Sequence, residues 1–127
     1  MYIIENKLKN DKDIYDLYES LDWNKYIRKS NEELLEIMEG SFYVVYVYDE
    51  DRLIGTGRMI SDGVLTSLIC GVGVAPAYQN KGIGKMIIEN ILEFGKSKNL
   101  FVELTCVENL EAYYNKFGLR KYAIAMK

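Results

Sequence analysis

Histidine is absent from this chain of 127 residues, and cysteine occurs only at Cys70 and Cys106. The lack of histidine excludes a catalytic triad that depends on it and, with so few cysteines, a zinc site. Proton transfer would have to use carboxylates, tyrosine, lysine, cysteine, water or the backbone. Two cysteines are also too few for a disulfide framework, and both occur in apolar runs. We therefore expect buried thiols and a reducing, cytoplasmic location.

Long apolar runs are missing as well, so no segment is expected to cross a bilayer. The first residues, Met1 to Glu5, lack the charged start and apolar core of a signal peptide. The formal net charge of −3 argues against a nucleic-acid partner, since such proteins usually carry a basic surface. The chain does have 49% apolar residues, enough for a packed core, and its length suits a single domain over residues 1–127.

Apolar periodicity predicts a mixed α/β fold. Strands are expected over residues 2–8, 42–48, 52–60, 64–74, 100–107 and 119–126. Helices are expected over residues 11–21, 32–38, 82–97 and 109–117. Their order gives a twisted, mostly antiparallel sheet of about six strands with four flanking helices.

Local signals refine this arrangement. Ser30 and Glu33 form a plausible capping box at the start of the second helix. Gly55 and Gly57 are expected to interrupt the strand over 52–60. The connection before Ser30 breaks the helical pattern and contains the only tryptophan, Trp23.

The most informative stretch runs from Leu68 to Gly95, where an apolar strand ends, a polar turn follows and a helix begins. The first turn of a helix has N–H groups without partners and a partial positive charge, so it can bind phosphate. Gly82 and Gly84 lack the side chains that would keep a diphosphate from the backbone, and Lys81 and Lys85 add positive charge. The stretch therefore predicts a site for a phosphorylated ligand.

Two well-known phosphate motifs do not fit this stretch. A dinucleotide-binding fingerprint needs a third glycine where the chain has Ile87. A P-loop needs a serine or threonine after its Gly-Lys pair, and Met86 follows Gly84-Lys85.

The pattern that fits is Gln79-x-x-Gly82-x-Gly84 after the strand end Val72-x-Val74-x-Pro76. Here the chain resembles the GNAT superfamily of N-acetyltransferases, whose signature in this setting is Gln/Arg-x-x-Gly-x-Gly/Ala. The resemblance covers most of the chain and implies acetyl-coenzyme A as co-substrate, with no metal. The coenzyme-binding residues that it implies are Val72, Gly73, Val74, Gln79, Asn80, Lys81, Gly82, Ile83, Gly84, Lys85 and Asn109. The alternative is a strand-to-helix turn whose glycines only permit close packing.

The resemblance also implies how the coenzyme is held. The amides of the loop bind the pyrophosphate, and the backbone near Val72 and Val74 pairs with the pantetheine arm as a strand would. The side chains of both valines are expected in the core. Asn109 is implied to contact the pantetheine or pyrophosphate, although capping of the helix that follows would explain it equally well.

Tyr114 is the expected general acid. GNAT proteins carry a Tyr-x-x-x-Gly-Phe pattern whose tyrosine reaches the coenzyme A sulfur, and here Tyr114 precedes Gly118 at that spacing, with Leu119 in place of Phe. Tyr113 is the rival, and for both the alternative role is packing against the sheet.

Glu103 is the candidate general base, since strand alternation places it opposite Val102 and Leu104. The alternative is a solvated surface carboxylate. Related acetyltransferases with a similar Arg-x-x-x-Asp-Gly stretch often carry an acidic residue just before Val-x-Val. Here that position is occupied by Cys70 and Gly71, which departs from the pattern.

The acceptor site is expected to be built by the first two helices, their connection and the hairpin turns. Asp22, Trp23 and Tyr26 combine a negative charge with aromatic faces that can hold an amine cation, although Trp23 could equally be a core anchor. Arg58 could contact an anionic group or form an ordinary surface ion pair.

The sequence thus predicts an N-acetyltransferase that moves the acetyl group directly to a small-molecule or peptide amine in a ternary complex. A non-catalytic acyl-coenzyme A sensor on the same fold is the alternative, and a structural adaptor is the third hypothesis. The short segment after Gly118 leaves a sheet edge that a second copy could cover as a homodimer.

Overall fold

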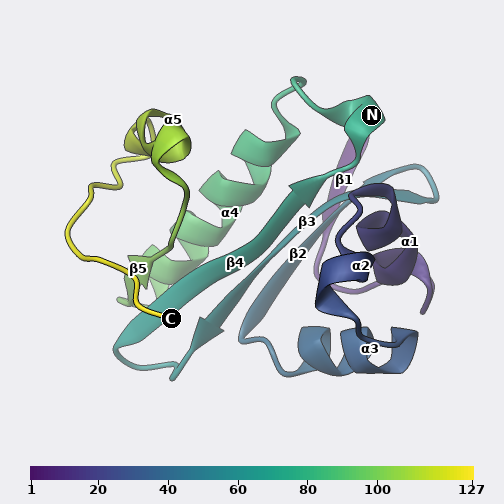
Figure 1. The fold of residues 1–127 in the computed structure, drawn as a ribbon, viewed down its shortest axis with the longest axis horizontal. Helices are drawn as coiled ribbons and strands as arrows, with labels where there is room; N and C mark the ends of the chain where they lie inside the picture. The colour runs from purple at the N-terminus through teal and green to yellow at the C-terminus, as the bar shows by residue number, and fades with distance from the viewer.

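The computed structural model describes residues 1–127 as a five-stranded sheet with helices on both faces (Figure 1). The strands lie in chain order: β1 (Tyr2–Glu5), β2 (Tyr43–Asp49), β3 (Arg52–Ser61), β4 (Thr66–Val74) and β5 (Phe101–Glu103). Neighbouring strands are antiparallel except β4 and β5, which are parallel. The prediction of a mixed, mostly antiparallel sheet is confirmed, with five strands instead of about six.

The helices are α1 (Asp13–Ser20), α2 (Asn24–Ile27), α3 (Asn31–Glu39), α4 (Ile83–Ser97) and α5 (Glu111–Asn115), with 3₁₀ turns at Pro76–Tyr78 and Glu108–Leu110. The capping box at the start of α3 is confirmed, because Glu33 N–H donates to Ser30 Oγ and the Glu33 carboxylate accepts from Ser30 N–H. The one-turn helix α2 lies in a segment that we expected to be irregular. No helix combines the length and the apolar character needed to cross a membrane.

Helix α4 packs on one face of the sheet through the glycines of β3. A Cβ atom at Gly57 would lie 2.6 Å from Ile87 Cγ2, and one at Gly55 would lie 3.1 Å from Ile83 Cγ2. Contrary to our expectation these glycines do not interrupt β3, which is continuous from Arg52 to Ser61. Their missing side chains instead bring the buried isoleucines of α4 close to the strand.

Helices α1 and α3 cover the opposite face (Figure 1). The side chains buried there include Ile14, Leu17 and Tyr18 of α1 and Leu34 of α3. The two layers of apolar side chains sandwich the sheet and form one continuous core.

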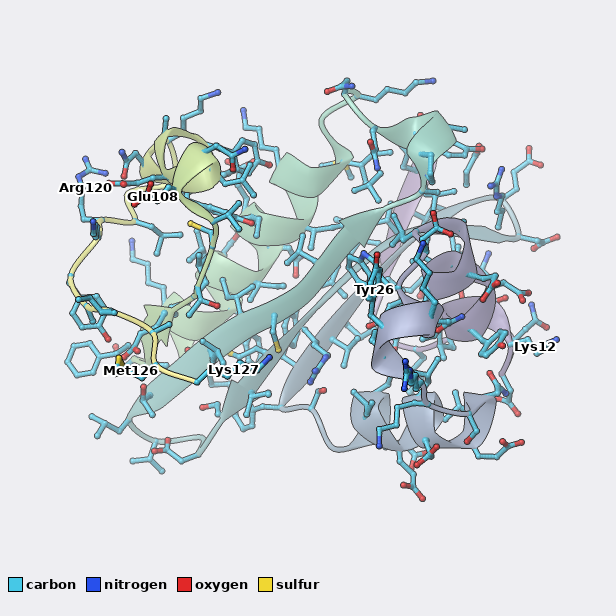
Figure 2. All side chains as sticks on the ribbon, viewed as in Figure 1. Lys12, Tyr26, Glu108, Arg120, Met126 and Lys127 are labelled. Carbon is cyan, nitrogen blue, oxygen red and sulfur yellow. The ribbon has the colours of Figure 1, made fainter.

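The C-terminal part of the chain differs most from the sequence prediction. Strand β5 ends at Glu103 instead of residue 107, and residues 119–127 form no strand, although Tyr122, Ile124 and Met126 alternate as in one. These three side chains are exposed, and Figure 2 shows Met126 at the end of this open segment. An extended segment becomes a strand only when its backbone groups find a partner, and sequence alternation cannot supply one.

The early end of β5 also corrects our expectation about the thiols. Both cysteines are free, but Cys106 is exposed and Cys70 is half-buried. Cys106 lies in the segment after β5 that no neighbouring strand covers, so the apolar residues around it do not form a buried layer.

The contact between β3 and α4 predicts a stability effect. Gly57→Ala should destabilise the fold by about 1–3 kcal/mol, because the added methyl group overlaps Ile87 and Ile91. Urea unfolding followed by circular dichroism measures this. Gly40→Ala is the matched control: Gly40 has φ −78°, which alanine adopts readily, so its effect should stay below about 1 kcal/mol. Equal stability of the two variants would contradict the close packing of α4.

Candidate functional site

Strands β4 and β5 separate after a short paired region. They pair from Thr66–Phe101 to Leu68–Glu103, after which β4 continues to Val74 and β5 ends. The edge of β4 from Ile69 to Val74 therefore has no strand partner on this side. Unpaired backbone N–H and C=O groups on a strand edge can bind an extended ligand.

A bulge shapes this edge of β4. The register with β3 shifts between Thr56 and Arg58, so that Gly71 and Val72 together lie opposite Gly57. Gly71 has φ +63°, which favours glycine. Bulges change the direction in which backbone and side-chain groups point, and this one lies where β4 has lost its second partner.

The loop between β4 and α4 places an uncapped helix end beside this edge. Gly82, with φ +83°, precedes α4, which has no side-chain cap, and the first helical hydrogen bond runs from Met86 N–H to Gly82 O over 3.1 Å. The N–H groups before Met86 are thus free for a ligand. A Cβ atom at Gly82 would have no atom within 4 Å, so a ligand can approach the backbone.

Side chains around the loop complete this arrangement. Gln79 Nε2 donates to Val74 O over 3.0 Å, which fastens the loop to the end of β4. Lys81 and Lys85 are exposed on either side of Gly82, and the first turn of α4 contains no acidic residue. Free N–H groups, a helix dipole and two cations suit a diphosphate group.

Tyr113 and Tyr114 on α5 occupy different places. Tyr113 Oη lies 3.3 Å from where a Cβ atom of Gly84 would be, so it faces the start of α4. Tyr114 lines a pocket of about 340 Å³ together with Leu68 and Glu103, where β4 and β5 separate. Burial raises the pKa of both phenols, and for Tyr114 the neighbouring Tyr113 raises it further. Tyr114 is therefore protonated at neutral pH.

Glu103 lies in the same pocket and is half-buried. Thr66 Oγ1 lies 3.5 Å from Glu103 Oε2, and a hydrogen bond to Glu103 raises the pKa of Tyr122. The structure therefore brings Tyr114 and Glu103 into one pocket, with the C-terminal segment as its other wall.

The expected acceptor residues are spread out. Trp23 packs on the sheet, where its Cη2 atom would lie 2.6 Å from a Cβ of Gly73, and its ring meets Tyr18 edge-on at 5.0 Å between centroids. Tyr26 is 76% exposed on α2 (Figure 2), and Asp22 is exposed with φ +60°. Trp23 alone lies against the edge of β4.

The remaining candidate residues are placed as follows. The Val72 side chain lies on the face covered by α4, because a Cβ atom at Gly57 would meet Val72 Cγ2 together with the isoleucines of α4. Ile83 is buried in the core. Asn80 is exposed in the loop with φ +63°. Asn109 is exposed in the 3₁₀ turn and does not cap α5, whose first residue is Glu111 and which has no side-chain cap.

Sequence reasoning missed one part of this edge. Tyr18 of α1 approaches Arg58 and Gly71 on the face opposite α4. Nothing in residue spacing shows that the Tyr18 hydroxyl would reach the bulge.

Comparison with known proteins gives a consistent result. A model described as the acetyltransferase (GNAT) family matches residues 11–119. The glucosamine 6-phosphate N-acetyltransferase of Schizosaccharomyces pombe is 30% identical over 96 residues, 68% of this chain and 86% of that protein. The histone acetyltransferase TAP1 of Glycine max is 30% identical over 93 residues, 65% of this chain. The chain spans 29–40% of the length of the first three curated relatives that it matches.

Solved structures agree with this fold. A protein of Staphylococcus aureus described as a probable acetyltransferase is 25% identical with a TM-score of 0.81, over 100% of this chain and 99% of that one. A GNAT-family acetyltransferase of Streptococcus pneumoniae TIGR4 is 21% identical with a TM-score of 0.75, over 100% and 98% of the two chains.

The contact of Trp23 with Gly73 predicts a spectroscopic effect. In Gly73→Ala the added methyl group would overlap the Trp23 ring and Leu21, so the ring should move toward solvent. Because Trp23 is the only tryptophan, its emission maximum should shift to longer wavelength. Gly40→Ala should leave emission unchanged, because its added methyl group would meet only backbone atoms of α3. An unchanged spectrum in Gly73→Ala would contradict the position of the ring.

Proposed function

The chain belongs to the acetyltransferase (GNAT) family, and from this premise we propose that it moves the acetyl group of acetyl-coenzyme A directly to a primary amine in a ternary complex. The observation that carries the proposal is the juxtaposition of an unpaired β4 edge with the uncapped N-terminus of α4. The first can bind an amide-containing arm and the second a diphosphate, which are the two recognisable parts of coenzyme A.

In this proposal the loop binds the pyrophosphate through the backbone N–H groups from Gly82 to Lys85. Lys81 and Lys85 add charge, while Gln79 and Asn80 shape the loop. The backbone from Val72 to Val74 pairs with the pantetheine arm and holds the thioester carbonyl near the N–H groups of the bulge, which stabilise the negative charge that develops on its oxygen.

Tyr114 donates its phenolic proton to the departing thiolate. Its raised pKa supports this role, because a protonated phenol is the form that can donate. The Tyr113 hydroxyl at Gly84 lies closer to the pyrophosphate loop, which favours Tyr114 as the acid.

Direct transfer is favoured over a covalent acetyl-enzyme. Burial raises the pKa of the Cys70 thiol, which disfavours its reactive thiolate, and the chain has no histidine to activate either cysteine. Glu103 is the proposed base for the amine, directly or through water, because it shares the pocket of Tyr114.

The acceptor is a small-molecule or peptide amine. The relatives named for glucosamine 6-phosphate and for histones show how widely amine acceptors differ within similar chains. Asp22, Trp23 and Tyr26 are proposed acceptor contacts, of which Trp23 has the strongest support because it lies on Gly73.

Location and assembly are part of the same proposal. Two free thiols suit a reducing compartment, and we propose the cytoplasm, although one relative in Arabidopsis thaliana is described as chloroplastic. The outer edge of β5 has no neighbouring strand, and a second copy pairing there would form a homodimer.

The loop assignment predicts the effect of two charges. In the double variant Lys81→Gln/Lys85→Gln, the dissociation constant for acetyl-coenzyme A should rise about 5- to 30-fold at low salt, and less at high salt. Isothermal titration calorimetry measures both. The control Lys96→Gln/Lys98→Gln removes two exposed charges at the other end of α4 and should bind normally. No binding by the unaltered protein would favour a structural adaptor.

The acid assignment predicts a loss of turnover. Tyr114→Phe should lower kcat about 10²- to 10⁴-fold and leave acetyl-coenzyme A affinity intact, because only the proton is removed. Thiol release measures turnover. Since burial raises the pKa of Tyr114, activity that depends on its proton should persist above the ordinary phenol pKa of about 10.

Tyr113→Phe is the matched comparison for this experiment. A large loss in Tyr113→Phe with none in Tyr114→Phe would transfer the role to Tyr113. Binding of acetyl-coenzyme A without turnover in the unaltered protein, over a broad set of amines, would favour the sensor domain.

A further inference from the structure

Arg58 is a half-buried cation without a negative partner. Its Nη1 atom lies 3.3 Å from Ser41 Oγ, and its Nε atom is buried with no hydrogen-bond partner. No carboxylate lies within ion-pair distance of it, since the two ion pairs of the chain are Lys9–Asp51 and Lys29–Glu33. A partly desolvated guanidinium in this state would be stabilised by an anion.

The Tyr18 hydroxyl is a second hydrogen-bond donor beside Arg58 Nε. A Cβ atom at Gly71 would lie 3.3 Å from Arg58 Nε and 3.5 Å from Tyr18 Oη. The space that a side chain at Gly71 would enter is therefore bordered by a guanidinium N–H and a phenol. Burial raises the pKa of Tyr18 more than the charge of Arg58 and a hydrogen bond from Arg58 lower it, so the phenol oxygen accepts from the guanidinium while its own proton remains to be donated.

Two other titratable groups lie here: Tyr46, whose pKa burial and the neighbouring Tyr18 raise to about 12, and Cys70, the partner of Arg58 across the ladder. Burial raises the pKa of its thiol, which therefore stays neutral and supplies no counter-charge.

This place adjoins the proposed transfer site. Gly71 belongs to the part of β4 that has lost its β5 partner, directly before Val72 and Val74. The Cβ position of Gly71 meets Arg58 and Tyr18 on the face covered by α1, where Trp23 packs on Gly73, and not the isoleucines of α4 on the other face. A group bound here would be held beside the thioester but apart from the coenzyme loop at the start of α4.

We propose that the amine acceptor carries a carboxylate or phosphate group, and that Arg58 binds this anion together with the Tyr18 hydroxyl. The proposal rests on the proposed acetyl transfer and narrows its acceptor to amines with a negative group. The planar guanidinium suits either anion because both present two oxygens at matching spacing.

Matched acceptors test the proposal. β-Alanine differs from β-alaninamide, and O-phosphoethanolamine from ethanolamine, chiefly in the negative group. The unaltered protein should prefer the anionic member of one pair by about 10- to 100-fold in kcat/KM, because a charge-assisted hydrogen-bonded pair is lost with the neutral member. The pair that shows the preference distinguishes carboxylate from phosphate.

Variants of Arg58 test whether this side chain causes the preference for anionic acceptors. Arg58→Gln should raise KM for the anionic acceptor about 10- to 100-fold, leave kcat nearly unchanged and spare the neutral acceptor. Arg58→Lys should keep part of the preference, because it keeps the charge but not the planar fork. Arg28→Gln removes an exposed charge at the end of α2 and is the control. An equal loss for both acceptors in Arg58→Gln, or no preference in the unaltered protein, would overturn the proposal.

A binding measurement separates this inference from acetyl transfer itself. Trp23 fluorescence should respond saturably to β-alanine or O-phosphoethanolamine in the unaltered protein and not in Arg58→Gln. If no amine is acetylated but this response is present, the anion site stands and acetyl transfer fails. If acetylation occurs but neither anion gives a response, the anion site fails and acetyl transfer stands.

Discussion

The close contact between β3 and α4 determines where the other parts of the site lie. Gly55 and Gly57 let Ile83 and Ile87 approach the strand backbone, which sets the position of α4 across the sheet. Since α4 follows β4 after a short loop, this docking brings the uncapped start of the helix to the end of β4. A helix standing farther from the sheet would have separated its free N–H groups from the strand edge.

The site combines backbone and side-chain contributions from distant segments. The end of β4 and the start of α4 contribute mainly main-chain groups, while α5 contributes Tyr114 and β5 contributes Glu103. Main-chain groups of a sheet and a helix end are rigidly placed, which suits the recognition of one invariant ligand such as the proposed coenzyme. Side chains from α1 and the turn after it, Tyr18 and Trp23, lie against Gly71 and Gly73 of β4.

The strand, loop and helix around Gln79, Gly82 and Gly84 were easier to predict from the sequence than the packing along the edge of β4. Gln79, Gly82 and Gly84 are local signals, because glycine at a left-handed position and a helix start depend on neighbouring residues. The extent of the edge strands was harder to predict. Strand β5 stops at Glu103, and the segment from Tyr122 to Met126 stays unpaired, although both segments alternate like strands. Pairing depends on a partner distant in sequence. The approach of Tyr18 to Arg58 likewise follows from packing across the sheet, which residue spacing does not report.

Glycine on both faces of the central strands also limits how this protein can diverge. The space where side chains of Gly55 and Gly57 would lie is filled by isoleucines of α4 on one face of the sheet. The corresponding space at Gly73 is filled by Trp23 on the other face. Substitution at these positions would disturb packing before it altered chemistry, so the strands themselves offer little room for new specificity. Change can accumulate more readily in α2 and in the C-terminal segment, whose side chains are largely exposed. A library intended to change the proposed acceptor specificity would therefore be best placed in those two segments, with the sheet left intact.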